Sequence, residues 1–332
     1  MTQQEITLLN LGSSLDDLAN LDPRGYGVCK LLYKAAREYT GMPLCVNAAR
    51  KIIETVKKDD VVFIMTGFIL APFNKAETDG VIGSVLLACA LVRALGAKPV
   101  VVCPDECVGA VEKLLAYLLE DSSDSVEIFV FTKDESEAAG CADKLISQAC
   151  PKAVISIECP GKDKNGVYRN AKGFDVTELE AKQDVLFEKL CEKGILNIAI
   201  GDLGNEIGMS TISGCLESKI PVSPVRTKTD NIITATVSDW GSYSLIAMLA
   251  YLLENPDIMH DANVQQEAMN IACRNGLIDM SGEHIPAIDG FGVEITASIV
   301  ALMKESVKSA LNLKESCKYW FDKMTEMGSF EK

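Results

Sequence analysis

The chain has 332 residues, of which 48% are hydrophobic and 24% are charged, a balance typical of a globular protein rather than of a disordered chain. It carries 32 Lys and Arg against 47 Asp and Glu, a formal net charge of -15, so its average field repels nucleic-acid phosphates and anionic lipid surfaces. We therefore expect neither nucleic acid nor a membrane as a partner, and a homo-oligomer stays open.

The amino terminus and the cysteines indicate a cytoplasmic protein. Residues 1–6 lack the basic start and apolar core of a signal peptide. The apolar run 81–95 is too short to span a bilayer and contains Arg93. The twelve cysteines are scattered singly, without the spacing of metal ligands, and we expect them to be reduced core residues.

In chain order, the first sixty residues predict helices over 15–38 and 46–56, interrupted by a turn at 21–27, and this helical N-terminal cap is expected to cover a sheet. Beyond it, β-branched runs alternate with helical periodicity. The runs that predict buried strands are 61–65, 99–103, 126–130, 153–157, 196–200 and 232–237. The segments that predict helices are 80–95, 108–119, 136–149, 181–193, 240–253, 264–275 and 294–311, the last two separated by the loop 278–292.

This alternation predicts an α/β fold: a doubly wound, mostly parallel sheet with helices on both faces, because each parallel crossover needs a helix and runs right-handed. We expect one domain over 1–332. Two sub-lobes, 1–150 and 151–332, are the alternative, although no linker separates them. In such a sheet, ligands bind beyond the carboxyl ends of the strands.

Four of the loops that follow predicted strands combine acidic residues with glycine, namely 66–80, 158–170, 201–209 and 238–242. These loops are where the chemistry is expected. For Asp79 and Asp239 the alternative is that they only cap the helices that follow, since aspartate is a common N-cap. The acidic pairs at 105–106 and 134–135 lack the glycines and are interpreted as plain caps.

Lys75, Glu77 and Asp79 are spaced two apart in the first of these loops. In an extended chain their side chains project to one side, which could set a cation beside two carboxylates. A solvated loop is the alternative. So long a loop after a buried strand is more often functional than decorative, which favours the first interpretation.

The loop 201–209 has three glycines around Asp202, Asn205 and Glu206. Such a loop lets backbone N–H groups approach a ligand. Its spacing is neither that of a dinucleotide-binding fingerprint nor that of a Walker loop, so nucleotide binding has weak support.

The two histidines, His260 and His284, lie outside these loops. Acid–base work therefore falls to Asp, Glu and Lys, and any metal would be a hard cation such as Mg²⁺ or Mn²⁺ held by carboxylates.

At these loops the sequence resembles the D-glutamate cyclase family, specifically its carboxyl-terminal cyclase domain, which also occurs as a free-standing bacterial protein. The strings that carry the resemblance are Gly67-Phe-Ile-Leu-Ala-Pro72, Ala76-Glu77-Thr78-Asp79-Gly80 with Gly83, Glu158-Cys159-Pro160-Gly161, Gly201-Asp202-Leu203-Gly204-Asn205-Glu206-Ile207-Gly208-Met209 and Val237-Ser238-Asp239-Trp240-Gly241. The resemblance implies dehydration of the small acidic amino acid D-glutamate to 5-oxo-D-proline, assisted by a divalent cation (Mn or Mg) and without an organic cofactor.

The chemistry of this reaction suggests a role for each candidate residue. Lys75 or a metal would neutralise the reacting carboxylate, and Glu77 would abstract a proton. Asp79, Asp202 and Glu206 would bind the metal or deliver a proton. The residues expected to bind substrate are Gly80, Gly83, Glu158, Gly161, Gly204, Asn205, Gly208, Ser238, Asp239 and Trp240, with Asn205 and the amides of the glycine loop holding a carboxylate and the developing oxyanion.

Two other functions stay open from the sequence. One is a non-catalytic protein that binds an acidic amino acid or a nucleotide, and the other is a metal-dependent hydrolase that uses the same carboxylates.

Overall fold

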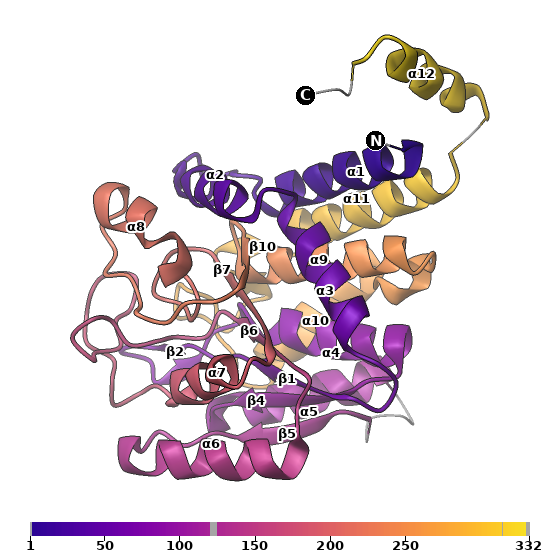
Figure 1. Cartoon of the computed structure of the whole chain (residues 1–332). Helices are drawn as coiled ribbons and strands as arrows, with labels where there is room; N and C mark the ends of the chain where they lie inside the picture. Colours follow the sequence, from indigo (N-terminus) through magenta and orange to yellow (C-terminus); the bar gives the residue numbers. More distant parts are fainter. Residues whose placement is uncertain (1, 120–124, 314, 330–332) are drawn as a thin grey trace.

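The computed structural model describes residues 2–119, 125–313 and 315–329, built around one parallel sheet (Figure 1). The six strands of the sheet are β1 (Val61–Met65), β4 (Lys98–Cys103), β5 (Glu127–Val130), β6 (Ala153–Ile157), β7 (Leu196–Gly201) and β8 (Asn231–Thr234). They are all parallel and lie in the order β5-β4-β1-β6-β7-β8. The predicted strands are confirmed, except that β8 ends three residues early.

The early end of β8 has a local cause. The backbone N–H of Thr236 donates to the carbonyl of Ala19 at 2.9 Å, so the chain leaves the sheet at this point and bonds to the end of the first helix instead. It then leads directly into the helix that begins at Ser238.

The strands are buried on both faces, except for the edge strand β5, because their side chains alternate between two apolar clusters. The four residues of β5 are exposed or half-buried, which corrects the expectation of a buried strand there. In β1, Val62 and Ile64 join the larger cluster, whereas Phe63 and Met65 join the smaller one. In register, Phe63 lies opposite Val100 of β4 and Val154 of β6. Continuous apolar runs are typical of such doubly covered strands.

Twelve helices surround the sheet in the described part of the chain. They are α1 (Gln3–Ala19), α2 (Val28–Thr40), α3 (Leu44–Thr55), α4 (Val81–Leu95), α5 (Asp105–Leu119), α6 (Glu135–Ala149), α7 (Gln183–Glu192), α8 (Ser213–Lys219), α9 (Ser238–Leu252), α10 (Ala262–Arg274), α11 (Val293–Leu311) and α12 (Glu315–Glu326). α3, α4, α5 and α9 pack on one face of the sheet, and α1, α10 and α11 pack on those helices as a second layer (Figure 1). α6 and α7 cover the other face.

The double layer explains the long apolar run of the sequence. α4 is buried from Val81 to Leu91 because it lies between the sheet and other helices. Among the described residues, no helix combines the length and the apolar character needed to cross a bilayer.

The path of the chain creates a crevice at the centre of the sheet. From β1 the chain moves outward through β4 to β5, then returns to β6 on the opposite side of β1. The loops after β1 and β6 therefore lead to opposite faces and leave space between them, which is where ligands bind in doubly wound folds. Two short hairpins that the sequence did not predict border this region, β2 (Ile69–Leu70) with β3 (Lys75–Ala76), and β9 (Ala287–Ile288) with β10 (Phe291–Gly292).

Candidate active site

A cavity of about 680 Å³ lies beyond the carboxyl ends of β1, β6 and β7. Its walls come from segments far apart in sequence, from the turn that holds Asp22 to the loop that holds Asp289. The acidic residues that line it are Asp22, Glu77, Asp79, Glu158, Asp202, Glu206 and Asp289. Seven carboxyl groups are thus gathered in one concave site.

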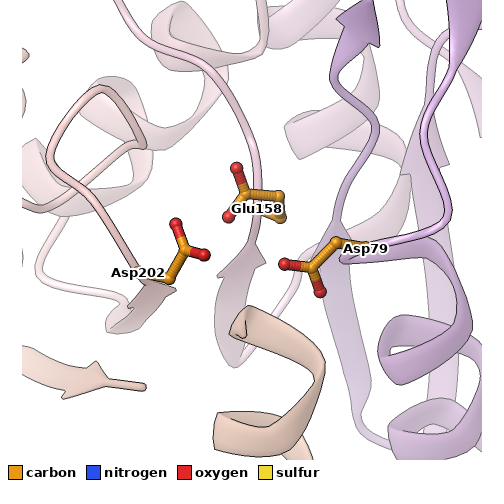
Figure 2. Close-up of side chains that lie close together, drawn as sticks. All are labelled: Asp79, Glu158 and Asp202. Carbon is orange, nitrogen blue, oxygen red and sulfur yellow. The ribbon is translucent and has the colours of Figure 1, made fainter. Parts of the chain in front are cut away.

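Three of the carboxylates that line the cavity lie close together (Figure 2). Asp79 ends the loop after β1, Glu158 directly follows β6 and Asp202 directly follows β7. One oxygen of each lies within 4.8 Å of the others. Oxygen atoms from three carboxylates are a donor set that suits a hard divalent cation.

Asp79 is held by the first turn of α9. One of its oxygens accepts the N–H of Asp239 at 2.8 Å and the other accepts the N–H of Ser238 at 3.0 Å. In return, Oδ1 of Asp239 accepts the N–H groups of Gly80 and Gly83 at 2.9 and 2.8 Å. Each aspartate therefore caps the first turn of the other's helix, which corrects the alternative that each only caps the helix that follows it, and Asp79 also belongs to the carboxylate cluster.

Glu158 is held by the same helix. Its Oε2 accepts the hydroxyl of Ser238 at 2.6 Å, and its backbone has a positive φ of 45°. A side chain at position 80 would collide with it, since an added Cβ on Gly80 would lie 2.6 Å from the Cβ of Glu158. Gly80 thus makes room for the carboxylate, and the unusual backbone of Glu158 is typical of a functional position.

The glycine loop wraps around the side chain of Glu206. The N–H groups of Leu203 and Gly204 donate to its two oxygens at 3.1 and 2.7 Å. These amides therefore have a partner within the protein, which corrects the expectation that they would bind a substrate carboxylate or an oxyanion. Glu206 fixes the loop, and the loop presents Asp202.

Burial makes the cluster hold protons. Desolvation, reinforced by the neighbouring carboxylates, raises the pKa of Glu77, Glu158 and Asp202 well above the usual range. Desolvation also raises the pKa of Asp79 to about 7, although its hydrogen bonds from backbone N–H groups oppose the shift. Near neutral pH the cavity can therefore both accept and release protons.

A family model described as D-glutamate cyclase-like, C-terminal, matches residues 15–304. The chain belongs to this family. The match spans all the acidic residues of the cavity and confirms the family suggested by the loop strings. A comparison with curated proteins gave no match.

The cavity of this D-glutamate cyclase-like chain contains part of the predicted set. Of the candidate residues, those that line it are Glu77, Asp79, Glu158, Asp202, Asn205 and Glu206. Lys75 does not. It is exposed in the β2–β3 hairpin, and its Nζ lies 2.6 Å from Nε2 of His284, which does not line the cavity either.

The other predicted residues do not line the cavity, and they support the residues that do. Gly161 and Gly208 allow close packing, and an added Cβ on Gly208 would lie 2.2 Å from the Cβ of Ala199. Trp240 is fully buried and packs on Phe291, with ring centroids 4.9 Å apart. Gly80, Gly83, Ser238 and Asp239 act through the caps described above, and Gly204 through its bond to Glu206.

Four charged residues that line the cavity were not predicted from the sequence, namely Asp22, Arg24, Lys172 and Asp289. Arg24 and Asp289 line the cavity and form an ion pair, in which Nη2 of Arg24 also donates to the carbonyl of Asp289 at 2.6 Å. Their local signals were weak: Arg24 lies in the glycine-containing turn 21–27, and Asp289 precedes a glycine within the loop 278–292.

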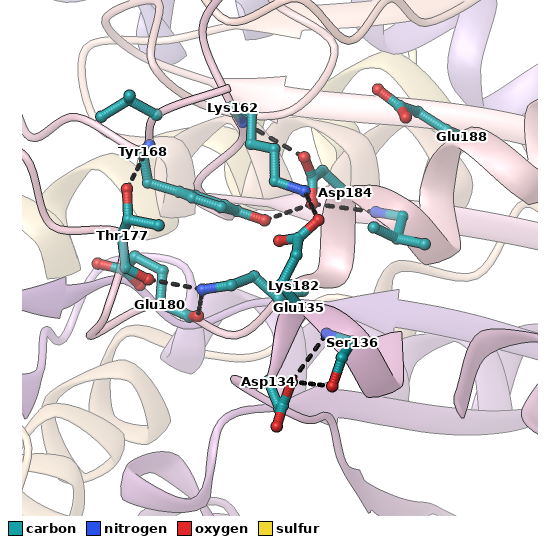
Figure 3. A network of polar contacts seen from close by, with 12 residues as sticks. Asp134, Glu135, Ser136, Lys162, Tyr168, Thr177, Glu180, Lys182, Asp184 and Glu188 are labelled. Carbon is teal, nitrogen blue, oxygen red and sulfur yellow. Dashed lines mark hydrogen bonds and ion pairs between the residues drawn. The ribbon is translucent and has the colours of Figure 1, made fainter. Parts of the chain in front are cut away.

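A buried polar network holds the loop that forms one wall of the cavity (Figure 3). The hydroxyl of Tyr168 donates to Asp184, and the ammonium groups of Lys162 and Lys182 lie 5.7 and 4.8 Å from the centre of its ring. Nζ of Lys182 donates to the carbonyls of Thr177 and Glu180. This network anchors both ends of the segment 170–174, which lines the cavity.

Proposed function

We propose that this protein is a lyase that cyclises D-glutamate to 5-oxo-D-proline with loss of water. The observation that supports this most is the convergence of Asp79, Glu158 and Asp202 within 4.8 Å in one cavity, where burial raises the pKa of all three carboxyls and brings that of Asp79 to about 7. Membership of the D-glutamate cyclase-like family supports the same reaction.

The proton balance of the reaction fits such a cluster. The substrate ammonium loses two protons in becoming the lactam nitrogen, and the departing carboxylate oxygen gains two in becoming water. No net proton is exchanged with solvent. A group of carboxyls that takes protons at one point and returns them at another therefore suits this chemistry better than a single strong acid or base.

Glu77 is the residue to which we assign proton abstraction. Its carboxyl is buried, and desolvation together with Asp79 raises its pKa. An ammonium group beside it favours its ionised form, so substrate binding itself would generate the base. The amine then attacks the side-chain carboxyl carbon of the same molecule, with proximity supplied by the folded bound conformation.

Asp202 is the residue to which we assign protonation of the departing oxygen. It is the most accessible member of the carboxylate cluster, its raised pKa keeps a proton available, and its carboxyl is hydrogen-bonded to Glu206. The attack forms the C–N bond of the ring, and the C–O bond of the resulting tetrahedral centre then breaks as the protonated oxygen leaves as water.

If the reaction uses a divalent cation, the ionised carboxylates of Asp79, Glu158 and Asp202 would hold it, because each offers an oxygen atom to a common point, and the cation would then replace the proton of Asp202 in activating the departing oxygen. Such an ion, when bound, would polarise the carboxyl group under attack.

The test is a chromatographic assay of D-glutamate and L-glutamate with the wild-type protein, with and without Mn²⁺. We expect 5-oxo-D-proline from D-glutamate, and a fall in kcat of about 100-fold or more for Asp202→Asn. The matched control is Asp143→Asn, which removes an exposed acid of α6 that pairs with Lys189. If D-glutamate raises the melting temperature and no lactam forms under either condition, the protein binds the amino acid without converting it and the proposal is wrong.

A further inference from the structure

The cavity is strongly acidic, yet the proposed substrate carries two carboxylates and one ammonium. Of the described residues that line the cavity, the cationic ones are Arg24 and Lys172. Lys172 is exposed at its place in the segment 170–174, whereas Arg24 is partly buried, with its side chain 25% exposed. Arg24 is therefore the less exposed of the two cations and the better placed to bind an anionic group of a ligand inside the cavity.

Arg24 has hydrogen-bonding capacity left over. The bonds it makes to Asp289 both come from Nη2, which donates to the backbone carbonyl and to Oδ2. A guanidinium has five N–H groups, of which Nη2 carries two. Within the described part of the chain, Nε and Nη1 have no hydrogen-bond partner in the protein. Their N–H groups remain for a ligand.

The position of Arg24 is fixed before any ligand binds. The carboxylate of Asp22 accepts the backbone N–H groups of Gly25, Tyr26 and Gly27, at 2.9, 3.3 and 2.6 Å. The guanidinium also lies over the ring of Phe291, 4.5 Å from its centre. A cation held by a closed turn and an aromatic face loses little freedom when it binds a carboxylate.

Arg24 also lies beside the acidic cluster. Its partner Asp289 is close enough for its charge to raise the pKa of Asp79 and Glu77. An α-amino acid has an anion and a cation on one carbon atom. With the carboxylate on Arg24, the ammonium would point toward the acids that are assigned to deprotonate it.

We propose that Arg24 binds the α-carboxylate of the substrate, so that the site selects amino acids in which this carboxylate is free. This inference rests on the proposed function for the identity of the substrate. Asp22 is the positioning residue that shapes the turn, and Asp289 orients the guanidinium.

The experiment compares D-glutamate with its α-carboxamide, D-isoglutamine, which keeps the amine and the side-chain carboxylate. For the wild type we expect kcat/KM to be about 100-fold or more higher for D-glutamate, as is typical of a charge-paired contact that one ligand lacks. For Arg24→Gln we expect a rise in KM for D-glutamate of at least tenfold, with the preference between the two substrates reduced to a few-fold. Unchanged KM and unchanged preference in this variant would overturn the proposal.

Two further variants distinguish a loss of ligand binding from a loss of folding. Arg24→Gln leaves the partly buried Asp289 unpaired, so the double variant Arg24→Gln, Asp289→Asn removes both charges and should restore the melting temperature while D-glutamate binding stays weak. Arg226→Gln removes an arginine that pairs with Glu188 outside the cavity and serves as the matched control. Binding restored by the double variant would overturn the assignment of Arg24.

A binding measurement separates this inference from the cyclase proposal. Glutarate has two carboxylates and no amine, so it cannot cyclise, and its affinity can be measured by calorimetry. We expect the affinity to fall at least tenfold in Arg24→Gln. If this happens while the wild type makes no lactam, Arg24 is still the carboxylate-binding residue and the cyclase proposal alone fails. If the wild type forms the lactam and the glutarate affinity is unchanged in Arg24→Gln, the cyclase proposal stands and the assignment of Arg24 is wrong.

Discussion

Asp79 and Asp239 exchange caps: Asp79 caps α9, which contains Asp239, and Asp239 caps α4, which follows Asp79. The carboxylate of Asp79 accepts N–H groups from the first turn of α9, and that of Asp239 accepts N–H groups at the start of α4. This exchange joins two helices that enter the site from different strands. It also means that a residue of the carboxylate cluster cannot shift without disturbing both helices.

The two caps should respond differently to removal of their charge. Both oxygens of Asp79 accept backbone N–H groups. In Asp79→Asn the NH₂ of the amide would face one of these N–H donors, so one capping hydrogen bond is lost and the free energy of unfolding falls by about 1–2 kcal/mol. In Asp239, one oxygen accepts both glycine amides and the other accepts the hydroxyl of Tyr243, which can rotate to accept instead. Asp239→Asn should therefore unfold in urea within about 0.5 kcal/mol of the wild type. A larger loss in Asp239→Asn than in Asp79→Asn would contradict the exchange.

Glu77 should make the protein less stable as the pH rises. Desolvation raises its pKa in the folded state, so the folded protein keeps a proton that the unfolded chain releases. That stabilisation is complete below the unfolded pKa and is lost as the pH rises through the folded one. Glu77→Gln stays uncharged, so its melting temperature should exceed that of the wild type increasingly from pH 5 to pH 8, by about 2 °C or more at pH 8. A difference that is constant over this range would show that the carboxyl is not the cause.

Mn²⁺ should stabilise the wild type through the cluster of Asp79, Glu158 and Asp202. A cation at 100 times its dissociation constant adds about 2.7 kcal/mol to the free energy of unfolding. The effect should be larger at pH 8 than at pH 6, because the ligands must release protons before they bind. Asp202→Asn should lose most of the thermal shift, while Asp143→Asn should keep it. Equal shifts in the two variants would place the ion elsewhere.

Gly208 should tolerate no side chain. Its φ is +91°, and an added Cβ would lie 2.2 Å from the Cβ of Ala199 in β7. Gly208→Ala is expected to lower the free energy of unfolding by about 2–5 kcal/mol, from strain and overpacking together. Gly140→Ala is the control, since no atom lies within 4 Å of an added Cβ there and alanine should stabilise α6 by about 0.5–1 kcal/mol. Similar stabilities for the two variants would contradict this account of the glycine loop.

The sequence predicted what depends on local pattern and on the rules of parallel sheets. The apolar β-branched runs 61–65 and 153–157 became β1 and β6, because strands buried on both faces leave a continuous signature. Asp79, Glu158 and Asp202 could be expected in one place because they follow neighbouring strands, and the carboxyl ends of those strands share an edge of the sheet.

The sequence could not predict contacts that tertiary packing decides. The spacing of Lys75, Glu77 and Asp79 suggested that they share one side, but the β2–β3 hairpin exposes Lys75 and buries Glu77. The glycine loop suggested free amides, whereas Glu206 of the same loop takes two of them. No local pattern links Arg24 to Asp289.

The pair of Arg24 and Asp289 joins residues 265 positions apart. Closing so large a loop costs conformational entropy, and contacts of this separation tend to form late in folding. During synthesis the whole central sheet, which ends at Thr234, leaves the ribosome before Asp289 does. The cavity is therefore completed after the sheet that carries it. A chain released before Asp289 is made would contain Asp79, Glu158 and Asp202 but would lack the residue that orients Arg24.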